Sequence, residues 1–79
     1  GAEVMSAGVA RLAHELSRAL ERRGYRRVTA YVIRRYDLGP GVYVGVVRRG
    51  AVRRLHSSAR AESPERALRA AFREGGLQC

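Results

Sequence analysis

The 79-residue chain is predicted to fold as an α+β domain of order α-β-β-β-α, a three-stranded antiparallel meander with two helices packed on one face. Two observations predict this class. Apolar residues recur at helical spacing near both ends of the chain, whereas the middle alternates with a period of two. Because the connections are short, consecutive strands must run antiparallel. A chain of this length can build one modest core, so residues 1–79 are expected to form a single domain.

The first element is expected to be an amphipathic helix over about residues 5–23. Arginine and glutamate occupy its polar side. Its apolar side is formed by Val9, Leu12, Ala13, Leu16, Ala19 and Leu20. Gly24 follows as the residue that ends the helix in a left-handed conformation.

Three strands are expected next, over about residues 25–35, 42–49 and 51–57. The segment DLGPG at 37–41 has the composition of a turn. Arg49-Gly50 is predicted to form a tight hairpin turn between the second and third strands.

Alternation assigns the faces of the first two strands. The side facing the helices is predicted to hold Val28, Val32, Val42, Val44 and Val46. The outer side would then hold odd-numbered residues, including Tyr25, Tyr31 and Tyr43. The register of the third strand stays open, because Val52 and Leu55 can both point inward only with a bulge.

The last element is expected to be a helix over about residues 64–74. Ser63 and Pro64 suit its N-cap and first turn. Gly75-Gly76 end it, and Leu77 can fold back as the apolar contact of a Schellman motif. Its apolar face is formed by Ala67, Leu68, Ala71 and Phe72.

The charge is concentrated in the middle of the chain. Residues 22–54 hold ten arginines, in five Arg-Arg doublets, and one acid, Asp37, so this segment carries the whole net charge of +9. The six remaining arginines are matched by six glutamates, and the chain has no lysine. A GC-rich genome would explain arginine in place of lysine, but not the position of the charge. That asymmetry indicates a polyanionic partner.

In a meander, the end of the first helix meets one end of the sheet, and four of the five doublets gather there; only Arg34 and Arg35 lie at the other end. We call this set the basic rim: Arg22, Arg23, Arg26, Arg27, Arg48, Arg49, Arg53 and Arg54. Arginine binds phosphate bidentately and stacks on bases. Tyr25, Tyr31 and Tyr43 would add a base-stacking platform. A solvated edge that discourages aggregation, or a sheet face used for dimerisation, would explain the same residues.

Nothing in the sequence indicates catalysis. His14 lies on the polar face of the first helix, and His56 is adjacent to Ser57 and Ser58, which is not the spacing of a base and its nucleophile. The seven acids do not cluster, so neither a metal nor another cofactor is expected. No stretch is apolar and long enough to span a membrane. A single cysteine, Cys79, excludes an internal disulfide and favours a cytoplasmic location.

The chain resembles the double-stranded-RNA-binding domain over about residues 8–73. Gly39-Pro40 lie between the first two strands, where that family often has Gly-Pro followed by a histidine that reads the RNA groove. The segment ARAESPERALRAA at 59–71 is similar to the family's junction between third strand and second helix. The histidine is absent here, and the positions of the family's phosphate-binding lysines hold Pro64, Glu65 and Leu68. The resemblance implies the fold. In this sequence the basic residues lie on the sheet and not at the start of the second helix, where the family has them.

A second resemblance is to the HicA-type messenger-RNA interferases, which share this topology. ELSRALERRGYRRV at 15–28 and ALRAAFREGGL at 67–77 look similar to that family's first and last helices. Its catalytic histidine belongs between the first two strands, where this sequence has YDLGPGVY. The resemblance therefore implies an inactive relative.

These observations predict a small, non-enzymatic nucleic-acid-binding protein that acts through the basic rim and the tyrosines. The expected binding is driven by phosphate contacts, and DNA and RNA are both open. A protein-interaction module or inhibitor that uses the same rim on an acidic protein surface is the alternative, and a HicA-like RNase a third. The uncovered sheet face is also a candidate homodimer interface.

Overall fold

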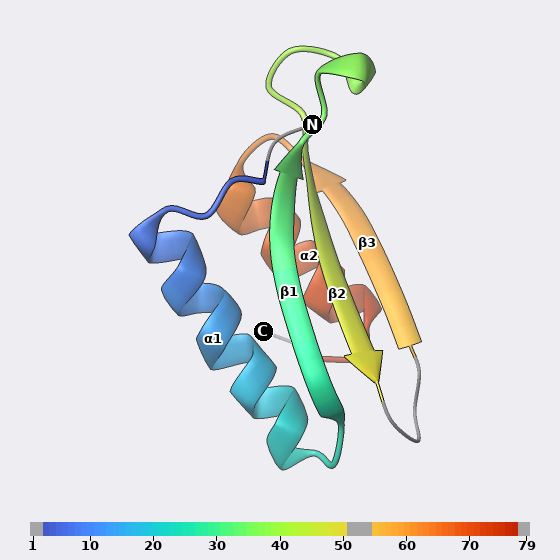
Figure 1. Cartoon of the computed structure of the whole chain (residues 1–79). Helices are drawn as coiled ribbons and strands as arrows, with labels where there is room; N and C mark the ends of the chain where they lie inside the picture. Colours follow the sequence, from blue (N-terminus) through green and yellow to red (C-terminus); the bar gives the residue numbers. More distant parts are fainter. Residues whose placement is uncertain (1–2, 51–54, 78–79) are drawn as a thin grey trace.

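The structure, a computed structural model, describes residues 3–50 and 55–77. The elements are, in order, α1 (Ala7–Arg22), β1 (Arg26–Arg34), β2 (Tyr43–Gly50), β3 (Leu55–Ala61) and α2 (Pro64–Glu74), with a 3-10 turn at Tyr36–Leu38. The strands form one antiparallel sheet in the order β1-β2-β3, and both helices lie on one side of it (Figure 1). The predicted α+β class and α-β-β-β-α order are confirmed.

Both helices end at the predicted glycines and α2 begins at the predicted Ser63 cap, whereas the Ser6 cap of α1 was not predicted. The Oγ atoms of Ser6 and Ser63 accept hydrogen bonds from the first turns of α1 and α2. At the end of α2, the Leu77 N–H donates to the Phe72 carbonyl at 2.9 Å, and Gly76 has φ 96°. This is the predicted Schellman motif, and Gly24, with φ 97°, ends α1 in the same way.

The core lies between the helices and one face of the sheet. Its buried members come from both helices, all three strands and the residue Leu77 after α2: Val9, Leu12, Ala13, Leu20, Val32, Val47, Ala59, Ala67, Leu68, Ala71, Phe72 and Leu77. Val28 and Ala30 of β1 pack against them, as the alternation predicts.

The predicted inner face of β2 is wrong. Arg34 of β1 pairs with Tyr43 of β2, so even-numbered residues of β1 lie beside odd-numbered residues of β2. Gly45 and Val47 therefore face the helices, and Val44 and Val46 lie on the outer face. The prediction assumed that Tyr36 lies opposite Val42, one residue out of register, and a shift of one residue exchanges the two faces of a strand.

Gly45 explains why this register packs well. A Cβ atom at Gly45 would lie 2.2 Å from the carbonyl oxygen of Ala67 in α2. The absence of a side chain therefore lets α2 lie directly on β2. A glycine inside a strand pattern often marks such a close approach, and this signal could have identified the inner face from the sequence.

A β-bulge interrupts the start of β1. Arg26 pairs with Gly50 and Thr29 with Arg48, so two residues of β1 lie opposite Arg49 alone. Arg27 has φ 55°, a conformation uncommon for a residue with a side chain. The extra residue allows Val28 to pack inward while Arg26 and Arg27 remain exposed.

The predicted hairpin turn at Arg49-Gly50 is also wrong. Both residues belong to β2, where Arg49 pairs with Leu55 and Gly50 with Arg26. The third strand, predicted to end at 57, continues to Ala61. Its last residues, SARA, look like a loop, but Ala59 is buried in the core that α2 covers. The predicted start of this strand lies in residues 51–54, outside the described residues.

No helix in the described part of the chain could cross a membrane.

Candidate functional site

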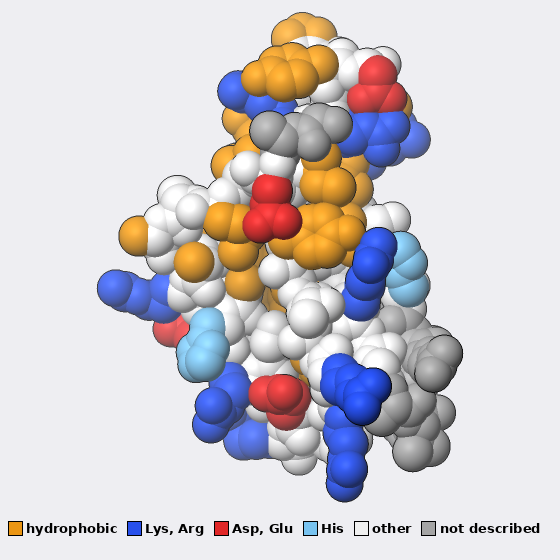
Figure 2. Space-filling view, in the orientation of Figure 1, with side chains coloured by type: hydrophobic (Ala, Val, Ile, Leu, Met, Phe, Trp, Pro, Cys, Tyr) orange, Lys and Arg blue, Asp and Glu red, His pale blue; other side chains and the backbone are white. Residues whose placement is uncertain are grey.

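The ends of four elements meet at one end of the molecule, as the meander predicts. The C-terminal ends of α1, β2 and α2 lie there beside the start of β1 (Figure 1). Five rim arginines are exposed at these positions, namely Arg22, Arg23, Arg26, Arg27 and Arg48. In Figure 2, arginine side chains lie on both sides of one acidic side chain at this lower end of the visible face, and hydrophobic side chains gather farther up.

Two predicted rim residues have structural roles. The Arg23 Nη1 donates a hydrogen bond to the Gly76 carbonyl at 2.7 Å, and the Arg49 Nη1 donates to the Gly75 carbonyl. These carbonyls follow the last turn of α2, where the helix dipole favours a cation. Arg49 is 5% exposed, so its assignment to a binding surface is wrong. Arg53 and Arg54 lie outside the described residues.

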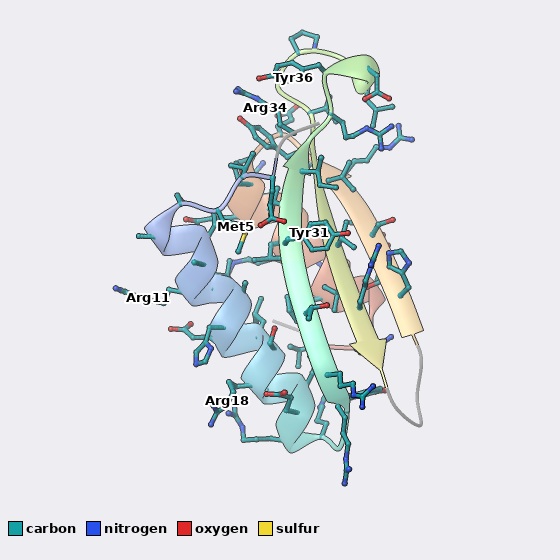
Figure 3. The ribbon with its side chains drawn as sticks, in the orientation of Figure 1. Met5, Arg11, Arg18, Tyr31, Arg34 and Tyr36 are labelled. Carbon is teal, nitrogen blue, oxygen red and sulfur yellow. The ribbon has the colours of Figure 1, made fainter. Side chains whose placement is uncertain are left out.

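Tyr31 carries the aromatic part of the outer face. Its ring lies 5.9 Å from the guanidinium carbon of Arg48, a diagonal neighbour on β2. Figure 3 shows Tyr31 in front of the sheet, on the side away from α2. A guanidinium over an aromatic ring gives a flat, cationic platform, and such platforms stack on nucleobases.

The other two predicted tyrosines do not share this face. Tyr25 and Tyr43 pack against the core on the helix side, and Tyr25 stacks on Arg49 with the guanidinium carbon 4.6 Å from the ring centre. Their placement on the outer face followed from the wrong register of β2 and from counting Tyr25 as a strand residue, whereas Tyr25 follows the cap of α1.

Apolar side chains adjoin Tyr31 on the outer face. By register, Ile33, Val44 and Val46 lie beside it, and Val46 is only 6% exposed although no helix covers it. The strip of exposed apolar surface is therefore narrow, because neighbouring side chains of the sheet cover most of Val46. A homodimer through this face stays a prediction.

The opposite end of the sheet carries a separate cluster. The guanidinium carbon of Arg34 lies 5.3 Å from the ring centre of Tyr36 and 5.2 Å from that of Tyr43. Arg35 binds Asp37 bidentately, with N–O distances of 2.7 and 2.6 Å. Both arginines lie away from the basic rim, as predicted. Figure 3 shows Arg34 beside Tyr36 at the β1–β2 connection, and Arg35 binds Asp37 of the same connection.

The Arg35–Asp37 contact gives a testable titration. The hydrogen bonds from Arg35 lower the pKa of Asp37 from 3.8 to about 2. Because the folded pKa lies below the ordinary value, the contact contributes to stability above pH 3.8 and is lost as the pH falls through about 2. We expect NMR titration of the Asp37 carboxyl to give the low value, and Arg35→Gln to return it toward 3.8. An ordinary pKa in the unmodified protein would contradict the contact.

No metal-binding group of three or more His, Cys, Asp or Glu residues occurs in the described ranges. His14 and His56 are both exposed. His56 pairs with Arg48 across the sheet on the outer face. Ser57 is the next residue on β3, so its side chain points to the opposite face of the sheet from His56. The Ser57 Oγ donates a hydrogen bond to the Ala71 carbonyl of α2 at 2.7 Å. Ser57 is therefore not placed as a nucleophile for His56.

No family model, curated protein or solved structure matches the chain. The resemblances to the double-stranded-RNA-binding domain and to HicA stay hypotheses from the sequence. Function must be inferred from the surface itself.

The sequence-based site omitted a second group of arginines. Arg60 of β3 and three arginines of α2 line one groove, described below. These residues were set aside because glutamates balance them in number. Their helical spacing was the signal, since arginines three and four residues apart share one face of a helix.

Proposed function

We propose that this protein binds nucleic acid, with Arg22, Arg26, Arg27 and Arg48 contacting phosphates and Tyr31 stacking on a base. One observation carries the proposal. Within residues 3–50 and 55–77, Arg35 alone forms an ion pair with an acid, although the chain carries a net charge of +9. Exposed arginines that form no ion pair with an acid repel one another, and a polyanion relieves that repulsion.

The outer face adds the second requirement of such a surface. Phosphate contacts supply affinity, whereas bases need a flat partner. The Arg48–Tyr31 pair supplies that partner next to the exposed arginines. Binding is expected to be weakly sequence-specific, because phosphate contacts and base stacking carry little sequence information.

The test is fluorescence anisotropy with labelled RNA and DNA, each as duplex and single strand, over a range of salt. We expect binding that weakens linearly in a log–log plot against salt. Arg48→Ala should reduce affinity about tenfold, because it removes a phosphate contact and half of the stacking platform. Arg11→Ala is the matched control, since Arg11 is exposed on α1 and points away from the sheet (Figure 3). It should change affinity by less than about twofold, since it makes no phosphate contact.

Weak binding that is equal for all these ligands and for heparin would contradict the proposal. An acidic protein partner would then be the better explanation of the basic rim. RNA cleavage that disappears in His56→Ala would instead indicate a HicA-like RNase.

A further inference from the structure

A groove runs between α2 and the outer edge of β3. It has a volume of about 360 Å³ and is lined by Arg60, Ala61, Arg66, Arg69, Ala70 and Arg73. The two alanines are half-buried, and all four arginines are exposed. Small side chains therefore line the groove together with guanidinium groups.

The α2 arginines share one face of the helix. Arg66, Arg69 and Arg73 follow at intervals of three and four residues, which places them side by side. At 1.5 Å per residue they extend over about 10 Å. The row is thus long enough to contact more than one phosphate of a strand.

The stability of the helix does not explain these arginines. Arg66 lies in the first turn of α2, where the positive end of the dipole disfavours a cation. Arg73 lies in the last turn, but Arg23 and Arg49 already donate to the carbonyls that follow this helix. Like charges at this spacing also disfavour a helix. An anion in the groove would remove each of these costs.

The acids nearest in sequence do not neutralise the groove. Among the described residues, no acid lies within 4 Å of any groove arginine, because Arg35–Asp37 is the only ion pair. Glu65 Oε1 lies 3.5 Å from the position of a Cβ at Gly8, so it points toward α1. Glu74 lines the neighbouring hollow rather than the groove.

Arg60 connects the groove to the outer face. By register it lies beside Val44 on that face, and it also lines a hollow of about 380 Å³ with Arg35, Val44 and Ser58. Within the described residues, the outer edge of β3 has no paired segment, whereas Val4 donates a hydrogen bond to Val32 at the edge of β1. Arginines therefore line a path from the outer face round the edge of β3 to α2, and one acid, Glu74, lines the hollow along it.

We propose that this groove binds the phosphates of a single nucleic-acid strand, and that the protein prefers single strands to duplexes. The inference rests on the proposed function. A duplex stays stiff over about 150 base pairs, so it cannot follow a surface that turns round one edge of a small sheet. A single strand can place bases on Tyr31 and its phosphates along Arg60 and the α2 row.

The test compares two double variants of equal charge. Arg66→Gln with Arg69→Gln changes the groove, and Arg11→Gln with Arg18→Gln changes the exposed face of α1, from which both side chains point away from the sheet (Figure 3). Glutamine favours a helix, so both variants should fold, which circular dichroism checks. Each is titrated with a labelled single strand and with the duplex of the same sequence over a salt series.

We expect the unmodified protein to bind the single strand more tightly than the duplex. The groove variant should lose about tenfold in single-strand affinity, and its log–log salt slope should fall by about 1.4, which is 0.7 for each lost contact. The α1 variant should keep the slope of the unmodified protein.

Other outcomes separate the two proposals. If the unmodified protein binds and Arg48→Ala weakens binding, but the groove variant matches the α1 variant, the groove inference fails and the proposed function stands. A preference for the duplex would overturn the groove inference alone. If the unmodified protein binds no nucleic acid, both proposals fail.

Discussion

Gly45→Ala is expected to destabilise the protein by about 3 kcal/mol or more, beyond the usual range for an overpacked core. The added Cβ would lie 2.2 Å from the Ala67 carbonyl oxygen, 2.5 Å from its carbon and 2.7 Å from the Leu68 nitrogen. These are backbone atoms of α2, so no side-chain rotation can relieve the contact. The helix must move away from β2, and the packing of Leu68 and Phe72 would be lost with it.

Urea unfolding followed by circular dichroism measures this effect. A loss of 3 kcal/mol corresponds to a melting temperature lower by roughly 12–24 °C in a domain of this size. Since small domains have a total stability of about 5–15 kcal/mol, the variant could also lose its cooperative transition.

Gly8→Ala is the matched control for this change. Gly8 lies in the first turn of α1, and a Cβ there would lie 3.5 Å from the Glu65 carboxylate, which is ordinary contact. Alanine stabilises helices relative to glycine by up to about 1 kcal/mol. The same chemical change should therefore have opposite signs at the two positions. A Gly45→Ala protein as stable as the unmodified one would mean that α2 does not lie directly on β2.

Local signals in the sequence predict the helices well because their causes are local. Ser63-Pro64 begins α2 and Gly75-Gly76 ends it, at the predicted bounds. The core face of β1 is also predicted correctly, since Val28 and Val32 alternate with exposed or half-buried residues.

The face of β2 depends on a long-range fact, the register across the β1–β2 connection. The sequence YVGVVRRG has valines at both even and odd positions, so alternation alone does not show which face of β2 is buried. Gly45 could have decided between them, since only the helix-covered face requires a missing side chain. The correct register would have separated exposed Arg48 from buried Arg49, because neighbours in a strand point to opposite faces. Arg23 could not be distinguished from Arg22 without knowing where α2 ends.

Arg49→Ala is expected to destabilise the protein by about 3 kcal/mol, through an unpaired buried carbonyl and a lost cation–π contact. The guanidinium of Arg49 donates to the Gly75 carbonyl and stacks on Tyr25. It thereby joins the end of β2 to the residues that follow α1 and α2. Because the side chain is 5% exposed, water cannot replace these contacts without opening the core.

Arg48→Ala, one residue away, should change the free energy of unfolding by less than about 0.5 kcal/mol, as exposed substitutions usually do. The adjacent arginines should thus separate stability from binding. Arg48→Ala lowers affinity for nucleic acid and leaves urea unfolding unchanged, whereas Arg49→Ala lowers the urea midpoint. Below its own unfolding transition, Arg49→Ala should keep the affinity of the unmodified protein, because Arg49 is not on the binding surface.

Arg49→Met keeps the apolar stem of the side chain, so its free energy of unfolding should fall between those of Arg49→Ala and the unmodified protein. An Arg49→Ala protein with normal stability and weak binding would reverse the assignment and return Arg49 to the basic rim.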